Sequence, residues 1–95
     1  MIVARNVGTI ACPDVLGDSP ILRLEFDWDG DLQVLCGHPH SEDTLPKLIC
    51  LGEFLDKDPG IAAVLEDLDQ GQVALRAAPG APWMIDHLPP EEQAA

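Results

Sequence analysis

The sequence has few basic residues, few aromatic residues and no tyrosine. Its 95 residues include 5 Lys and Arg against 17 Asp and Glu, which gives a formal net charge of −12. A chain with so few cations lacks the basic face that phosphate contacts require, and this argues against direct nucleic-acid binding. The same shortage of cations argues against adsorption to an anionic membrane surface.

Long apolar runs and a disulfide framework are also missing. No apolar stretch approaches the ~20 residues that cross a bilayer. The first residues show no charged segment followed by an apolar one, so we expect no secretory signal. Three cysteines at irregular spacings favour reduced thiols, and therefore a cytoplasmic protein, over a set of disulfides.

The hydrophobic fraction, in contrast, is 46%, too high for a disordered acidic tail. The length allows one domain with a modest core. We expect a single α+β domain over residues 1–88 and a frayed C-terminal tail over residues 89–95. The predicted architecture is a small antiparallel sheet of about four to five strands, with one or two short helices on one face.

A β-hairpin gives the clearest local signal. Apolar and charged residues alternate over residues 21–28, which predicts a half-buried strand. Asp29-Gly30 is a preferred pair for a tight two-residue turn with positive φ at both positions. Residues 32–37 then predict the returning strand.

The remaining elements are marked less clearly. Strands are predicted over residues 2–4, 72–77 and 83–85, and the ambiguous residues 48–51 fit a short buried strand before a single helical turn at 52–56. A helix is predicted from Asp58, a good N-cap, with Pro59 at its first position and Gly71 as a stop. Residues 6–20 contain several breakers and predict a loop with about one helical turn.

Acidic residues concentrate in two segments of the chain. Residues 14–31 and residues 53–69 each hold six acids and one base, a net charge of −5 apiece. Acids at the end of the predicted helix oppose its dipole, although a solvated helix face explains them more simply. The candidate partner-binding residues are the acids of the hairpin tip and of the helix end, together with one aromatic anchor: Asp27, Asp29, Asp31, Glu66, Asp67, Asp69 and Trp83. For Trp83, a position in the core is the alternative.

Cysteine and histidine residues form a second, weaker candidate site. Cys36, His38 and His40 point the same way on an extended strand. Cys and His are zinc ligands, and a fourth ligand could come from Cys50 or Cys12. The spacing matches no familiar zinc motif, so packing of the cysteines as small hydrophobes is the favoured alternative. Acidic surroundings disfavour a reactive thiolate, and we expect neither an enzyme nor a cofactor.

Three stretches, taken together, resemble a known family. They are DGDLQVLCG (29–37), ICLGEFLDKDP (49–59) and APGAPW (78–83). Their order and spacing resemble a family of small acidic bacterial proteins known mainly as an uncharacterised domain, whose relatives occur as immunity proteins beside polymorphic toxins. The resemblance covers residues 29–83, and its motifs are modestly specific. It implies a toxin-immunity role and supplies no catalytic residues.

We therefore expect a non-enzymatic acidic binding protein that neutralises a basic partner protein. One alternative is a nucleic-acid mimic that inhibits a nuclease or defence complex, which predicts carboxylates in a spaced row. A compact patch around an aromatic anchor would instead favour the basic protein partner. A zinc-binding protein using Cys36, His38, His40 and Cys50, and a domain whose charge serves only solubility, are further alternatives. The exposed edge of a small sheet leaves homodimerisation open.

Overall fold

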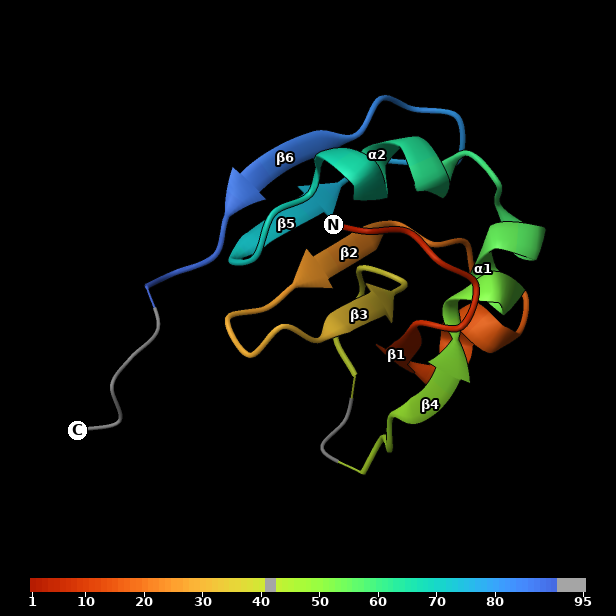
Figure 1. Ribbon diagram of the computed structural model, residues 1–95. Helices are drawn as coiled ribbons and strands as arrows, with labels where there is room; N and C mark the ends of the chain where they lie inside the picture. Colours follow the sequence, from red (N-terminus) through yellow and green to blue (C-terminus); the bar gives the residue numbers. More distant parts are fainter. Residues whose placement is uncertain (41–42, 91–95) are drawn as a thin grey trace.

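The computed structural model describes residues 1–40 and 43–90, and within them six strands form one sheet in the order β4-β1-β3-β2-β5-β6 (Figure 1). The predicted tail therefore lies partly outside the described residues. The strands are β1 (Gly8–Ala11), β2 (Arg23–Phe26), β3 (Leu32–Leu35), β4 (Lys47–Cys50), β5 (Gln72–Leu75) and β6 (Met84–His87). The helices are a 3₁₀ turn η1 (Pro13–Leu16), α1 (Leu51–Lys57) and α2 (Ile61–Asp67).

The α+β class is confirmed, but the sheet is larger than predicted and is not purely antiparallel. β1 lies where a loop was predicted, between β3 and β4, and it runs parallel to β3. No strand forms at residues 2–4. The segment Gly8-Thr9-Ile10-Ala11 has small residues and little period-2 contrast, so its strand conformation depends on non-local pairing. Thr9 is buried there, and its hydroxyl donates to the Ile49 carbonyl oxygen at 2.7 Å.

The hairpin of β2 and β3 is confirmed, with Leu24 opposite Val34 and Phe26 opposite Leu32. Its turn differs from the prediction, because residues 27–31 form a longer loop. Only Gly30 has a positive φ there, at 88°. The Gly30 N–H donates to the Asp27 carbonyl oxygen at 3.0 Å, which is typical of a type I turn followed by a left-handed glycine.

The helices also begin and end at other residues than the sequence predicts. α1 has seven residues instead of one turn. α2 begins at Ile61, and Asp58 does not cap it. The Asp58 carboxylate instead binds the Arg76 guanidinium at 2.5 Å, so the long-range ion pair replaces the local cap.

The C-terminal end of α2 carries a compensating positive charge. The amino group of Met1 donates to the carbonyl oxygens of Leu65 and Leu68, at 3.0 and 2.6 Å. A cation at this position interacts favourably with the helix dipole. This contact offsets the unfavourable acids that the sequence places at the same helix end.

One face of the sheet forms the core with both helices. Leu24, Leu32 and Val34 are buried from the strands, and Phe54 and Leu65 are buried from the helices. The strand predicted at residues 48–51 forms as β4 (Lys47–Cys50), but it is not buried. β4 is an edge strand, and Leu48 is 83% exposed. No described helix is long and apolar enough to cross a membrane.

Four of the five Lys and Arg side chains form bonds within the fold. Arg5 pairs with Asp56 at 2.9 Å, Arg23 with Glu25 at 2.5 Å, and Arg76 with Asp58. The Lys57 ammonium donates to three carbonyl oxygens, those of Val15, Gly17 and Ser19. Arg5, Lys57 and Arg76 therefore tie the connecting segments to the helices and to β5, whereas the Arg23–Glu25 pair lies within β2.

The Asp58–Arg76 pair should contribute more to stability than the Asp56–Arg5 pair. The Arg76 side chain is only 6% exposed, so Asp58→Asn leaves a buried charge without its counter-ion. We expect Asp58→Asn to lower the free energy of unfolding by about 2 kcal/mol, less than for a fully buried pair because Asp58 is partly exposed. Urea denaturation measures the difference. Asp56→Asn is the matched control and should have little effect, because its pair is exposed; equal losses in the two variants would contradict this ranking.

Candidate functional site

The hairpin loop and the loop after α2 meet at one end of the sheet. Gln70 Nε2 donates to the Trp28 carbonyl oxygen, and the Gly71 N–H donates to the Phe26 carbonyl oxygen at 2.7 Å. These bonds bring two acidic loops together. We call this region the acidic end, and it comprises Asp27, Asp29, Asp31, Asp67 and Asp69. Residues 24–46 and 58–75, which form it, contain no Lys or Arg.

Asp27 builds the loop of the acidic end. Its carboxylate accepts bonds from the backbone N–H groups of Asp29 and Asp31, at 3.0 and 2.9 Å, and from Gln33 Nε2 at 3.2 Å. Asp29 and Asp31 are exposed. Of the three predicted hairpin acids, Asp27 is therefore structural, and Asp29 and Asp31 remain available to a partner.

The aromatic residue of the acidic end is Trp28, not Trp83. Trp28 is 41% exposed, and its indole N–H donates to the Pro89 carbonyl oxygen at 2.7 Å. Its ring lies against Gly71, where a Cβ would approach it closer than 3.0 Å. Trp83 lies beyond the other end of β5, partly buried under Arg76 at 4.4 Å.

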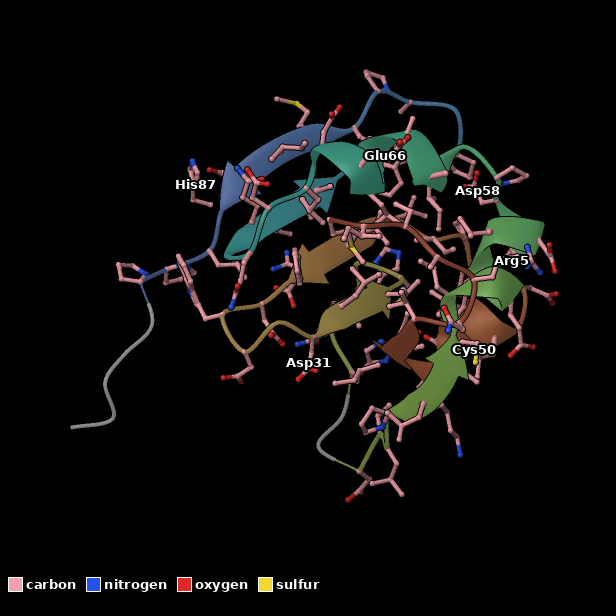
Figure 2. All side chains as sticks on the ribbon, viewed as in Figure 1. Arg5, Asp31, Cys50, Asp58, Glu66 and His87 are labelled. Atoms are coloured by element: carbon pink, nitrogen blue, oxygen red, sulfur yellow. The ribbon has the colours of Figure 1, made fainter. Side chains whose placement is uncertain are left out.

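The predicted acids of the helix are only partly brought to this end. Asp69 lies in the loop that contacts the hairpin, and Asp67 is the last residue of α2. Glu66 is exposed on α2, apart from Asp31 (Figure 2). Asp29, Asp31 and Asp69 thus lie in the two loops that meet beside Trp28, a residue that the predicted set omitted.

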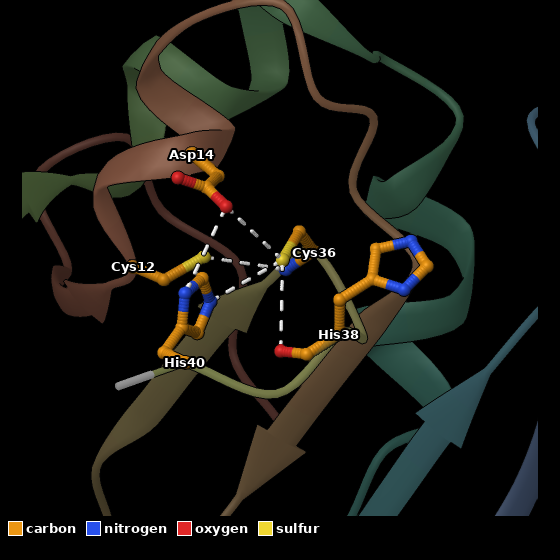
Figure 3. Close-up of polar contacts among 5 residues, drawn as sticks. All are labelled: Cys12, Asp14, Cys36, His38 and His40. Carbon is orange, nitrogen blue, oxygen red and sulfur yellow. Dashed lines mark hydrogen bonds and ion pairs between the residues drawn. The ribbon is translucent and has the colours of Figure 1, made fainter. Parts of the chain in front are cut away.

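A cluster of sulfur, nitrogen and oxygen atoms lies at the opposite end of β3 (Figure 3). Cys12 directly follows β1, and Cys36 directly follows β3. Because these neighbouring strands are parallel, the residues after them converge. The Cys36 N–H donates to Cys12 Sγ at 3.3 Å, and both cysteines are buried.

His40 and Asp14 complete this cluster. His40 Nε2 lies 3.3 Å from Cys36 Sγ. Asp14 Oδ2 lies 3.7 Å from His40 Nδ1 and 3.8 Å from Cys36 Sγ. The Cys12, Cys36 and His40 ligand atoms all lie within 4.8 Å of one another. We call Cys12, Asp14, Cys36 and His40 the thiol cluster.

The thiol cluster contains three of the five residues that the sequence offers as zinc ligands, Cys12 among them. Cys36 and His40 belong to it, whereas the ring of His38 points away and only the His38 carbonyl approaches Cys36 (Figure 3). Cys50 is exposed and lies opposite Gly8, at the other end of β1. The expected alternation fails because β3 ends at Leu35 and the chain turns at Gly37, where φ is 84°.

The electrostatics of the thiol cluster disfavour nucleophilic attack. Burial raises the pKa of the Cys36 thiol above its ordinary value, and Cys12 and Asp14 act in the same direction, while a backbone contact with His38 opposes them. The thiol of Cys36 therefore stays protonated near neutral pH, and a protonated thiol is a weak nucleophile. Cys12, Cys36 and His40 nevertheless offer the atom types that bind soft or borderline cations.

Comparison with known proteins gives no relative for either region. No protein-family model, curated protein or solved structure matches the chain. The resemblance to immunity proteins therefore stays a prediction, and the geometry alone must support a function.

Gly71→Ala should displace Trp28 from the acidic end. Gly71 and Gly80 have nearly equal positive φ values, 86° and 84°, so alanine adds a similar backbone strain of about 1–2 kcal/mol at each. Only at Gly71 does the new Cβ also collide with the indole. In a Trp83→Phe background, we expect Gly71→Ala to change the Trp28 fluorescence and to lower stability more than Gly80→Ala. Identical spectra and unfolding curves would show that Gly71 does not position Trp28.

Proposed function

We propose that this protein is a cytoplasmic, non-enzymatic binding protein that neutralises a basic partner protein through its acidic end. The observation that carries this proposal is the compact group of aspartates around the half-exposed Trp28, built from segments without a single Lys or Arg. Complementary charge accelerates association and fixes orientation. A tryptophan inside such a patch is a typical anchor of a protein interface. Toxin neutralisation, which the family resemblance implies, is one form of this role.

The spacing of the aspartates favours a protein partner over nucleic-acid mimicry. One carboxylate oxygen each from Asp27, Asp29 and Asp31 lies within 4.8 Å of the others. Such a cluster is a compact patch and not a row of charges following a phosphate backbone. Crowded like charges are unfavourable in the free protein, and a cationic side chain of the partner would relieve that repulsion.

The positions of the Lys and Arg side chains also favour the acidic end as the partner-binding surface. Arg5, Arg23 and Arg76 each pair with an acid of their own outside the acidic end. Lys57 is bound to carbonyl oxygens near η1. None of these four Lys and Arg side chains therefore neutralises the acidic end, where the Met1 amino group at the end of α2 is the nearby cation.

Charge reversal at the acidic end should abolish partner capture. The variant Asp29→Lys, Asp31→Lys, Asp69→Lys alters three exposed carboxylates for which the structure shows no side-chain bond. We expect the immobilised unmodified protein to retain basic proteins from its native lysate at low salt and to release them at high salt, as the Debye length falls from ~10 Å at 0.1 M to ~3 Å at 1 M. The triple variant should retain none of them, as measured by mass spectrometry of the eluates.

A control variant with the same net charge distinguishes binding at the acidic end from binding that depends only on the overall negative charge. Asp18→Lys, Asp43→Lys, Glu53→Lys changes three other exposed acids and leaves the acidic end intact. It should retain the same partners as the unmodified protein. If both triple variants lose them equally, or if retention is insensitive to salt, the proposed site is wrong. Circular dichroism of both variants excludes loss of fold as the cause.

A further inference from the structure

We propose that Cys12, Cys36 and His40 form a binding site for a thiophilic divalent cation of the Zn²⁺ class, in which Asp14 orients His40. The site is independent of the acidic end and of the partner proposed for it. Its ligands come from two segments 24 residues apart, and they converge because β1 and β3 are parallel neighbours.

The distances within the thiol cluster are close to those of a tetrahedral metal site. Zn–S bonds of about 2.3 Å and Zn–N bonds of about 2.0–2.1 Å place neighbouring sulfur and nitrogen ligands about 3.5 Å apart. Cys36 Sγ and His40 Nε2 are 3.3 Å apart, and Cys12 Sγ lies within 4.8 Å of both. Small side-chain shifts therefore suffice to bring all three atoms onto one ion.

The two nitrogens of His40 have separate roles in this site. Nε2 faces the cysteine sulfur and supplies the metal bond, whereas Nδ1 faces Asp14 Oδ2 at 3.7 Å. A carboxylate on the far nitrogen fixes the tautomer and the ring orientation of a ligating histidine. The 3.7 Å separation is longer than a hydrogen bond, so Asp14 acts as a positioning residue once a small side-chain shift closes this gap.

The coordination chemistry requires only the protein's own ligands, the entering ion and solvent. Both cysteines bind as thiolates, so each loses its thiol proton to solvent when the ion enters. His40 binds as the neutral ring and keeps the proton on Nδ1. Three protein ligands leave one position of a tetrahedral ion for water. A cavity of about 240 Å³ borders Cys12 and His40 and provides room for that water.

Packing of two cysteines as hydrophobes does not explain the whole cluster. Apolar packing requires no imidazole nitrogen in contact with the sulfur and no carboxylate beside it. Cys36 Sγ has three polar atoms around it, from Asp14, His38 and His40. A thiol has one proton and can donate to only one of them, whereas a bound cation satisfies both sulfurs and the imidazole together.

Cobalt(II) titration of the reduced, chelator-treated 95-residue protein tests the site. We expect saturation at one equivalent, with a thiolate-to-cobalt charge-transfer band and the intense visible bands of tetrahedral coordination, and loss of both when Zn²⁺ is added. His40→Ala should weaken binding by more than the ~10–100-fold expected when an outer partner is removed. Asp14→Asn should weaken it within that range and leave the thiolate band unchanged at saturation.

Two matched controls use a cysteine and a histidine that lie outside the cluster. Cys50 and His38 are exposed, so Cys50→Ser and His38→Ala should fold normally and keep the full spectrum and affinity. Because Cys50 is the only cysteine outside the cluster, an unchanged band in Cys50→Ser assigns the thiolates to Cys12 and Cys36. A spectrum without a thiolate band, or a band lost in Cys50→Ser or His38→Ala, overturns the proposal.

Discussion

The guanidinium of Arg76 holds together three parts of the chain that share no local sequence signal. It donates to the Asp58 carboxylate and to the Ile21 carbonyl oxygen, at 2.5 and 2.9 Å, and lies over the Trp83 ring. The turn between the helices, the segment entering β2 and the loop before β6 are thereby joined to the end of β5. A buried guanidinium requires its carboxylate. This requirement takes Asp58 away from the helix cap that its sequence position suggests.

Because the chain has so few cations, binding them within the fold leaves much of the acidic surface without a neutralising partner. Lys57 and Arg5 act like Arg76, since each ties a loop or the N-terminal segment to α1. Every cation bound in this way neutralises charge around α1, η1 or β5, away from the hairpin tip. The acidic end is therefore a by-product of how the fold is stabilised as well as a candidate binding surface. Only the half-exposed Trp28 points specifically to a partner, because solubility does not require an exposed indole.

The sequence predicted the features that depend on neighbouring residues. Alternation over Arg23–Phe26 and Leu32–Leu35 identified the hairpin, and α2 lies between the predicted start at Pro59 and the predicted stop at Gly71. The sequence-based prediction failed where a residue distant in the chain decides the conformation. β1 is a strand because β3 and β4 flank it, and Asp58 is an ion-pair partner because Arg76 reaches it. The prediction of a tight turn at Asp29-Gly30 was wrong because the Asp27 carboxylate stabilises a longer loop.

The unpredicted parallel pairing of β1 and β3 also decides the candidate sites. The spacing in the sequence indicated Cys36 and His40 as possible ligands. The parallel pairing of β1 with β3 is what brings Cys12 and Asp14 beside them. The hairpin tip precedes the first residue of β3, whereas Cys36 follows its last. The acidic end and the thiol cluster are thus separated by the length of β3. Loss of a metal should therefore leave the acidic end intact, and charge reversal at the acidic end should leave the thiol cluster intact, so that each proposal can fail without the other.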